Sequence, residues 1–573
     1  MNKLNKTFKI NPLLLTDSYK ISHHYMYPEG TEKVYSNMTA RSDKYAPDYS
    51  KGGIISFFQQ ATMRIINNYF KENFFDLPKD EAISSIKKDL SDHINGDYDV
   101  THFESLHDLQ YLPIKVKAIP EGMFVPIKVP FLTIINTDDR FYWLVNYLET
   151  IISNTIWHPI TVATIIKGFK NIGNKWYNKN DKDNKWFLDF CFHNFAMRGM
   201  SGLDSAVGTG LAFAIHSKGS DTLPVIHYAR EYYDEKGCSV FSLPATEHAV
   251  ASSNIIFNSK DILENRLEGE KQFLKKLITE IHPTGMVSYV ADTYDLWSVV
   301  TEILPSLKDD IMTRNGKLII RPDSSPTTPA DIICGINVES YDNLEEAKVD
   351  FSDLLHDNQV HGEADFEIDT DTIVKVGNSL FKLTADVDWN RYDKQYYFIE
   401  NINIESQELE LNPSYKGVVE LLWDIFGGTV NEQGYKILDS HIGFIYGEGI
   451  SQDMLNEIYA RLDGKGFAAS NVVVGIGSFS QIFCSRDTYG QAIKATAVQI
   501  KGELHNIYKD PKTSGNFNKK SAKGLMCVNK DMTLKQECTW EEESQGLLQT
   551  IYENGKFYNT VNLSEIRERL TKI

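Results

Sequence analysis

The sequence lacks the features of secreted, membrane-spanning and disulfide-bonded proteins. Its six cysteines are scattered and none forms a C-x-x-C pair, which argues against a disulfide framework or a zinc cluster. No apolar run approaches the roughly 18 residues that a membrane span needs. The N-terminus, MNKLNKTFKINPLLLTDSYK, has neither the apolar core nor the cleavage site of a signal peptide. We therefore expect a cytoplasmic protein that has no membrane partner.

The chain also has fewer basic than acidic residues. The chain has 59 Lys and Arg against 78 Asp and Glu, which gives a net charge of −19. Proteins that bind nucleic acids present basic surfaces, so we expect no nucleic-acid partner. Much of the excess acid lies between Glu339 and Glu410, where nineteen acidic residues accompany five basic ones.

This acidic stretch has the pattern of short β-strands. DTIVKVGNSLFKL places two strand-like runs around a Gly-Asn turn, and QYYFIENINIESQELEL continues the pattern. We predict an acidic, β-rich insertion over residues 333–414. A disordered acidic loop is the alternative, and the many aromatic side chains of the stretch disfavour it.

One arrangement recurs in the middle of the chain. A short apolar run of strand type ends, and polar or glycine residues follow directly, in FAMRG, ATEH, DTYD, RPDSS, GEG and IGS. Helical patterns such as LDSAVGTGLAFAIH lie between several of these runs. Alternating strands and helices predict a parallel sheet. In a (β/α) barrel, catalytic groups gather at the carboxyl ends of such strands. A single aspartate after a strand is more often a helix N-cap, so the prediction depends on the repetition.

Two of these segments are glycine turns suited to phosphate. GEG contains Gly447 and Glu448, and IGS contains Gly477 and Ser478. Glycine lets the backbone approach a ligand closely, and N–H groups at the start of a helix favour an anion. The late position of both turns matches the usual phosphate site of a barrel.

The domain organisation follows from these patterns. A chain of 573 residues with 42% hydrophobic residues suggests two to four domains. Residues 1–160 mix helical and strand-like pieces, and the last residues return to strand-like, basic sequence. We predict an α/β protein with a (β/α) barrel over residues 161–489, which contains the insertion. Residues 1–160 and 490–573 are predicted to form one α+β domain beside the barrel.

Several stretches together resemble the nicotinate/nicotinamide phosphoribosyltransferase-like family. They include LLLTDSYKISHHYMYPEGTEKVYS, FAMRGMSG, HSKGSDT, FSLPATEH, ADTYDLW and LIIRPDS, and they span nearly the whole chain apart from the acidic insertion. The resemblance implies an irregular barrel of the type II phosphoribosyltransferase kind. It also implies transfer of the phosphoribosyl group of phosphoribosyl pyrophosphate to nicotinamide, which yields nicotinamide mononucleotide and pyrophosphate for NAD salvage.

The resemblance implies a site for the nicotinamide ring. Phe195 and Tyr19 would hold the ring between their flat faces. In the family this tyrosine comes from the partner subunit, so a homodimer with shared active sites is expected. Asp221 would accept a hydrogen bond from the carboxamide group, and Arg198 would lie near the ring. A carboxylate at Asp221 would disfavour nicotinate, whose own carboxylate it would repel.

The resemblance also implies sites for the phosphates. The residues expected at the phosphoribosyl group are Arg321, Asp323, Gly447, Glu448, Gly477 and Ser478. Those expected at pyrophosphate or ATP are Arg41, Arg486, Lys494, Lys509 and Lys519. Mg²⁺ is expected on the pyrophosphate, held by substrate oxygens and water, because the sequence shows no dedicated protein cage for a metal.

The remaining catalytic assignments centre on His248. Alone, His248 reads as an ordinary residue at the start of a helix. In the family, the matching histidine is transiently phosphorylated by ATP, and an imidazole that is partly neutral at pH 7 can attack a γ-phosphoryl group. Glu247 would orient His248, Asp323 would help to position the reacting groups, and Asp295 would support the site.

Two other functions remain open. Nicotinate phosphoribosyltransferase activity is the same chemistry on the acid, and Asp221 is the residue that distinguishes the two. A non-catalytic interaction protein that keeps the fold is the second alternative. The presence of Arg198, Asp221, His248, Arg321 and Asp323 argues against it.

Overall fold

The structure is a computed structural model. It describes residues 10–325, 327–357, 369–377, 379–393, 396–410, 412–447, 449–509 and 522–572. The chain divides into two compact units, and each is described by itself. Unit 1 comprises Met1–Ser242, Gly449–Leu455 and Val473–Ile573, and unit 2 comprises Leu243–Glu448 and Asn456–Val472. The predicted domain limits stay a prediction.

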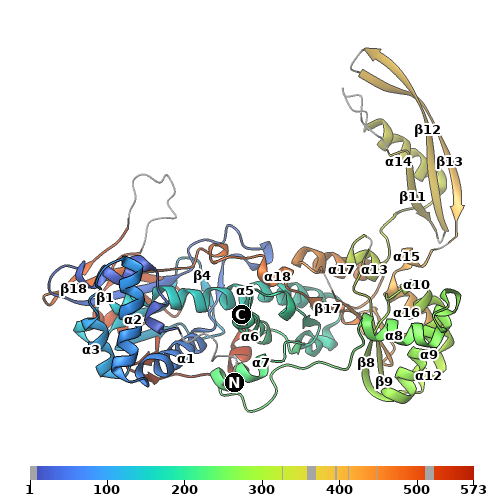
Figure 1. The fold of residues 1–573 in the computed structure, drawn as a ribbon. Helices are drawn as coiled ribbons and strands as arrows, with labels where there is room; N and C mark the ends of the chain where they lie inside the picture. Colours follow the sequence, from blue (N-terminus) through green and yellow to red (C-terminus); the bar gives the residue numbers. More distant parts are fainter. Residues whose placement is uncertain are drawn as a thin grey trace. The chain divides into compact units, whose positions relative to one another are not determined.

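Both ends of the chain contribute to one antiparallel sheet in unit 1. Its strand order is β19-β18-β1-β5-β3-β22-β23. β1 (Thr31–Thr39) pairs with β18 (Ala492–Ile500) on one side and with β5 (Pro130–Asn136) on the other. Figure 1 shows β1 in blue beside β18 in orange, although they are far apart in sequence. The predicted α+β portion built from the N- and C-terminal segments is confirmed.

The remaining strands of this sheet follow the alternation of their sequences. β3 (Ile114–Ala118) reads IKVKA, and its three apolar side chains are buried while the two lysines are half-buried. The sheet ends in β22 (Gln549–Glu553) with β23 (Lys556–Phe557), and at the other edge in β19 (Glu503–Asn506). A period of two places alternate side chains on opposite faces, so one face of β3 packs into the core.

Helices cover the core of unit 1. The longest is α5 (Glu149–Asn180), and α1 (Gln59–Phe70) and α6 (Leu203–Ala214) pack against it. Unit 1 also contains α2 (Lys79–Ile94), α3 (Thr101–Leu109), α7 (Val225–Tyr233) and α20 (Leu563–Leu570). No helix in the described part of the chain, α5 included, has both the length and the apolar character to cross a membrane.

Each unit contains three short parallel strands. In unit 1, β6 (Phe192–Asn194) pairs in parallel with β7 (Gly219–Ser220) and with β17 (Val473–Ile476). In unit 2, β9 (Asn315–Arg321) pairs in parallel with β8 (Thr284–Val290) and with β16 (Ile442–Tyr446). Parallel strands alternating with helices confirm the predicted α/β class. Several candidate site residues, among them Phe195, Asp221 and Asp323, follow the carboxyl ends of these strands.

The acidic segment of unit 2 is β-rich, as predicted. Its sheet has the order β10-β11-β12-β13, formed by Glu339–Tyr341, Asp371–Val376, Ser379–Asp393 and Tyr396–Leu409. Helix α14 (Leu344–Asp357) lies along this sheet (Figure 1). Buried side chains of the helix and sheet, among them Phe351, Leu355 and Leu383, form a separate core. This packing excludes a disordered loop for the described residues of the segment.

The two ends of this insertion meet. The Ile336 N–H donates a hydrogen bond to the Ser414 carbonyl at 2.8 Å. Gly335 and Gly417 both adopt positive φ angles, of 89° and 78°, in a region that favours glycine. A Cβ at either position would collide with the backbone of the opposite end. Glycine at both positions therefore permits the close crossing of the incoming and outgoing chain.

Candidate active site

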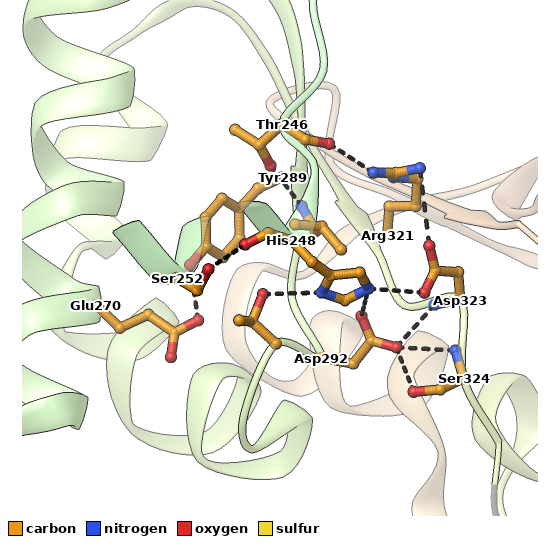
Figure 2. A network of polar contacts seen from close by, with 11 residues as sticks. Thr246, His248, Ser252, Glu270, Tyr289, Asp292, Arg321, Asp323 and Ser324 are labelled. Atoms are coloured by element: carbon orange, nitrogen blue, oxygen red, sulfur yellow. Dashed lines mark hydrogen bonds and ion pairs between the residues drawn. The ribbon is translucent and has the colours of Figure 1, made fainter. Parts of the chain in front are cut away.

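His248 lies where a strand-like segment turns into a helix. Ala245 forms a parallel bridge to Ser288 of β8, Glu247 is the N-cap residue, and His248 is the first residue of α8 (His248–Ser259). The Ser252 hydroxyl donates to the His248 carbonyl at 2.6 Å (Figure 2). The backbone of His248 is therefore fixed by the sheet on one side and by the first turn of the helix on the other.

Both nitrogens of the His248 ring have partners. Nδ1 lies 3.1 Å from the Thr293 hydroxyl, and Nε2 lies 3.0 Å from Oδ1 of Asp323. Nε2 is also 3.9 Å from Oδ1 of Asp292 (Figure 2). The side chain keeps 48% exposure, so the ring is oriented and still reachable from solvent.

Asp292 is a buried carboxylate that positions the Asp323 loop. Oδ2 of Asp292 accepts hydrogen bonds from the Asp323 N–H at 2.9 Å, the Ser324 N–H at 2.8 Å and the Ser324 hydroxyl at 2.5 Å (Figure 2). Its Oδ1 is buried and has no hydrogen-bond partner among the described residues. The DTYD segment, which the sequence analysis placed after a strand end, contains both Asp292 and Asp295, and only Asp295 was given a role there.

The two acidic residues chosen from the sequence next to these groups have different surroundings. Asp295 is the N-cap of the short helix α10 (Leu296–Ser298), and it accepts hydrogen bonds from the N–H groups of Trp297 and Ser298. Glu247 is exposed, and its side chain makes no capping bond. Thr293 and Asp323 orient the His248 ring. The catalytic roles assigned to Asp295 and Glu247 remain predictions.

Arg321 and Gly447 flank Asp323 in unit 2. Arg321 ends β9, donates from Nη2 to the Thr246 carbonyl at 2.5 Å, and has Nη1 4.0 Å from Oδ2 of Asp323 (Figure 2). A Cβ at Gly447, directly after β16, would lie 3.2 Å from the Asp323 Cβ. A side chain at position 447 would therefore crowd Asp323. Glu448 lies outside the described residues.

Three of these groups also form the candidate metal site of the described residues. His248, Asp292 and Asp323 each offer a ligand atom, and these atoms lie within 4.8 Å of one another. Two carboxylates are suitable ligands for a hard cation such as Mg²⁺. The prediction that no protein cage holds a metal stays a prediction.

A second group of polar residues lies in unit 1, at the ends of β6 and β7. Nε2 of His193 lies 2.8 Å from Oδ1 of Asp221, and the Ser242 hydroxyl donates to the same oxygen at 2.5 Å. The Phe195 ring centroid lies 4.6 Å from that of His193. Phe195 and Asp221, both predicted from the sequence, are thus connected through His193. The sequence analysis missed His193 because a histidine in a strand usually reads as an ordinary buried residue.

The loop that follows Phe195 packs closely on the start of a helix. Gly199 leaves no room for a Cβ, which would clash with Oγ of Ser478, the N-cap of α18 (Phe479–Ile482). Gly477 has open space on its Cβ side. Arg198 is exposed and, within the described part of the chain, has neither a hydrogen bond nor an ion pair. Its guanidinium is available to a ligand.

Cations gather around one carboxylate in unit 1. Nζ of Lys20 lies 2.7 Å from Oε2 of Glu149, and Nζ of Lys494 lies 3.8 Å from Oε1 of the same residue. Burial lowers the pKa of Arg41, and the charge of Arg486 lowers it further. Burial also lowers the pKa of Lys494, with further lowering from the charges of Arg41 and Lys20. These mutually repelling cations suit a multiply charged anion. The sequence analysis missed Lys20 and Glu149.

Three predicted residues remain. Tyr19 is 64% exposed, and Nζ of Lys20 lies 5.7 Å from its ring centroid. Lys509 is exposed. Lys519 lies outside the described residues.

Comparisons with known proteins agree on one family. The sequence model of the "Nicotinate phosphoribosyltransferase (NAPRTase) family" matches residues 190–358 and 403–556, and that of the "Nicotinamide phosphoribosyltransferase, N-terminal domain" matches residues 11–76. A protein named nicotinamide phosphoribosyltransferase from Acinetobacter baylyi is 35% identical over 99% of this chain and 98% of its own length. One with the same name from Mycoplasma pneumoniae is 28% identical over 87% of this chain and 92% of its own.

Among solved structures, human nicotinic acid phosphoribosyltransferase aligns with 97% of this chain and 93% of its own, at 13% identity and a TM-score of 0.48. The family models cover more than half of the chain, and the Acinetobacter relative covers nearly all of it. The chain therefore belongs to the nicotinate phosphoribosyltransferase family of enzymes, as its motifs predicted.

Proposed function

We propose that this enzyme transfers the phosphoribosyl group of phosphoribosyl pyrophosphate to the ring nitrogen of nicotinamide. The products are nicotinamide mononucleotide and pyrophosphate, and the reaction serves NAD salvage. The observation that favours this function is the Asp221 carboxylate, held by His193 and Ser242 next to the Phe195 ring. The relatives named nicotinamide phosphoribosyltransferase support the same base.

Asp221 favours nicotinamide over nicotinate. Its carboxylate accepts a hydrogen bond from the carboxamide NH₂, whereas a nicotinate carboxylate would be repelled and would leave that bond unmade. The Phe195 ring stacks on the pyridine ring, and Tyr19 of a second subunit covers the other face. The 64% exposure of Tyr19 in one chain supports this role, because an exposed aromatic ring is free to contact another copy. The active form is accordingly a homodimer with shared active sites.

Phosphoribosyl transfer needs no enzyme nucleophile. The sugar carbon develops oxocarbenium character as pyrophosphate departs, and the protein must hold the reactants in line and stabilise the leaving charge. Arg41, Arg486, Lys494 and Lys20 bind the pyrophosphate, since these four cations outnumber the two carboxylates near them, Glu149 and Asp487. Mg²⁺ enters with the pyrophosphate as part of the substrate. Asp323 and Arg321 contact the ribosyl phosphate portion.

His248 accepts a phosphoryl group from ATP. Because Nε2 lies near two carboxylate oxygens, the ring proton resides there, and Nδ1 carries the lone pair. A bond forms between this nitrogen and the γ-phosphorus while the bond to the ADP oxygen breaks, and water later releases phosphate. Asp323 and Asp292 stabilise the positive charge of the phosphorylated ring.

The enzyme acts in the cytoplasm.

A comparison of the two bases as substrates tests this function. Purified enzyme is mixed with phosphoribosyl pyrophosphate, Mg²⁺ and either nicotinamide or nicotinate, with and without ATP, and mononucleotides are measured by mass spectrometry. We expect nicotinamide mononucleotide to form at least tenfold faster than the nicotinate product. Faster formation of the nicotinate product would favour the acid as substrate, and no product from either base would favour a non-catalytic role.

A further inference from the structure

A cavity of about 470 Å³ lies in unit 1, away from the groups described above. Its lining comes from α5, from the turns that precede β6 and β7, and from α20. Asp189 and Lys218 stand before these two strands, whereas Phe195 and Asp221 follow them. The cavity is thus at the amino ends of the strands, opposite the proposed nicotinamide site. Its volume falls within the roughly 300–1,000 Å³ of small-molecule sites.

The lining of the cavity is strongly cationic. Its five basic side chains accompany two acidic ones, in a protein whose net charge is −19. The basic residues are Lys167, Lys170, Lys185, Lys218 and Arg567. Clustered cations in a concave surface raise the local concentration of anions.

The two carboxylates of the lining are already paired. Asp189 binds two of the lysines, with Oδ1 3.0 Å from Nζ of Lys170 and Oδ2 3.0 Å from Nζ of Lys218. Glu568 pairs with Lys572, at 2.8 Å. The other three basic side chains of the lining therefore have no carboxylate within ion-pair distance in the described part of the chain.

These three cations are Lys167, Lys185 and Arg567. Lys167 has only a long contact of 3.5 Å to the Leu570 carbonyl. Arg567 donates to the Ala214 carbonyl from Nε and Nη2, at 2.9 and 2.6 Å, and to the Ser239 carbonyl from Nη2 at 2.8 Å. Burial lowers the pKa of both side chains, and for Arg567 the charges of Glu235 and Asp189, which do not contact it, oppose this effect. A partly buried cation with no carboxylate in contact is costly, and a bound anion would reduce that cost.

His216 adds a hydrogen-bond acceptor to the lining. It is 6% exposed, and Nε2 has no hydrogen-bond partner among the described residues. Burial and the charges of Lys167 and Lys170 lower its pKa, so the ring is neutral. The Ala163 backbone opposes this lowering of the pKa by hydrogen bonding, and we place the single ring proton on the nitrogen that faces it. Nε2 is then an unprotonated acceptor, which a ligand hydroxyl satisfies.

We propose that this cavity binds a phosphorylated sugar or polyol. Lys167, Lys185 and Arg567 bind the phosphate, and Nε2 of His216 accepts a hydrogen bond from a hydroxyl of the ligand. A cationic lining alone would accept any anion, whereas the neutral buried imidazole selects one that also has hydroxyl groups. This site is independent of the proposed reaction.

Isothermal titration of the full chain with glucose 6-phosphate, inorganic phosphate and glucose tests the proposal. We expect glucose 6-phosphate to bind more tightly than phosphate, and glucose not to bind. The double variant K167M/K185M should bind glucose 6-phosphate at least tenfold more weakly, because it loses two charge-assisted hydrogen bonds. K175M/K182M changes the same charge in the same segment outside the lining, and its affinity should match that of the wild type.

Two further measurements separate the cavity from other phosphate sites. His216→Phe should bind glucose 6-phosphate and phosphate equally, because only the acceptor is lost. In spectra of the ¹⁵N-histidine-labelled protein, the Nε2 resonance of His216 is identified as the one that H216F lacks. Its chemical shift in the wild type should change when glucose 6-phosphate is added. The proposal is overturned if K175M/K182M weakens binding as much as K167M/K185M. It is also overturned if R486M alone abolishes binding, or if the His216 resonance stays unchanged at saturation.

Discussion

Oδ2 of Asp292 accepts the backbone N–H of Asp323 at 2.9 Å, so a buried carboxylate fixes the loop whose own carboxylate contacts His248. The same oxygen also accepts the N–H and the hydroxyl of Ser324. The orientation of Asp323 therefore depends on the three hydrogen bonds that Oδ2 of Asp292 accepts. This relationship distinguishes Asp292 from Asp295, which caps a helix.

Asp292→Asn should impair catalysis more than Asp295→Asn. In D292N, an amide whose oxygen accepts the two backbone N–H groups makes neutral hydrogen bonds and directs its NH₂ at Nε2 of His248, whereas hydrogen bonds to a charged group are worth about 1.5–3 kcal/mol. We expect kcat to fall about tenfold or more in D292N, while the KM for nicotinamide changes little. D295N keeps an N-cap side chain, since asparagine caps a helix about as well as aspartate, so it should change the Tm little and leave kcat within threefold. Steady-state kinetics and thermal melts of both variants measure these effects, and equal losses of kcat would contradict the assignment.

Asp221→Asn should reduce the preference for nicotinamide. The variant loses a charged acceptor for the carboxamide and no longer repels a carboxylate, so kcat/KM for nicotinamide should fall about 10- to 100-fold. The relative rate with nicotinate should rise. D204N, a neutralisation of an exposed aspartate in the same unit, is the control and should keep the wild-type ratio. A ratio of the two bases that is the same in D221N and wild type would remove Asp221 from base recognition.

Glu149→Gln should expose the repulsion among the surrounding cations. Glu149 contacts both Lys20 and Lys494, so its neutralisation leaves their charges unbalanced. We expect a lower Tm at low salt, recovery of part of the loss in 0.5 M salt, and a larger stabilisation by pyrophosphate than in the wild type. Asp139→Asn, which removes the exposed partner of Lys33, is the control. A pyrophosphate-induced Tm shift no larger than that of the wild type would argue against anion binding by this group.

Glu270→Gln should change how stability depends on pH. Burial raises the pKa of Glu270 from its ordinary value of 4.5 to about 7, although the Tyr289 hydroxyl donates to it at 2.6 Å (Figure 2). Between these pKa values the folded state binds more protons than the unfolded state, so the wild type loses stability as pH rises from 4.5 to 7.

The expected cost of this carboxylate above pH 7 is at most roughly 3 kcal/mol, at about 1.4 kcal/mol per unit of pKa. E270Q should therefore be more stable than the wild type at pH 8, and the two should converge at pH 4.5. Urea unfolding at both pH values measures the difference. Glu268→Gln, on the exposed side of the same helix, should leave the pH dependence unchanged. A difference between E270Q and wild type that is independent of pH would contradict the raised pKa.

The sequence predicted the residues that follow strand ends because a parallel sheet brings those ends to one edge. His248, Arg321 and Asp323 were identified in this way, and the structure places them in one network. The choice between Asp292 and Asp295 required the exact start of α10, which spacing alone does not reveal. Lys20 and Glu149 lie 129 residues apart, and no local pattern relates them.

The acidic insertion was predicted as β-rich, and its helix was missed. Ala347, Phe351 and Leu355 recur every four residues and are all buried in α14, so the helical period was present in the sequence. The dense negative charge of the surrounding residues obscured it. His193 was missed for a different reason, since its partner Asp221 lies on the next strand and only the pairing of β6 with β7 brings them together.

The meeting of Ile336 with Ser414 has an evolutionary consequence. The family model passes over residues 359–402, all of which lie between these two points of contact in the sequence. Because the segment leaves and re-enters the chain at one place and has its own core, a gene could gain or lose it in a single event while the rest of the fold stays in register. The insertion can therefore be present or absent without changing the rest of the fold, and family members of different lengths can share one catalytic framework.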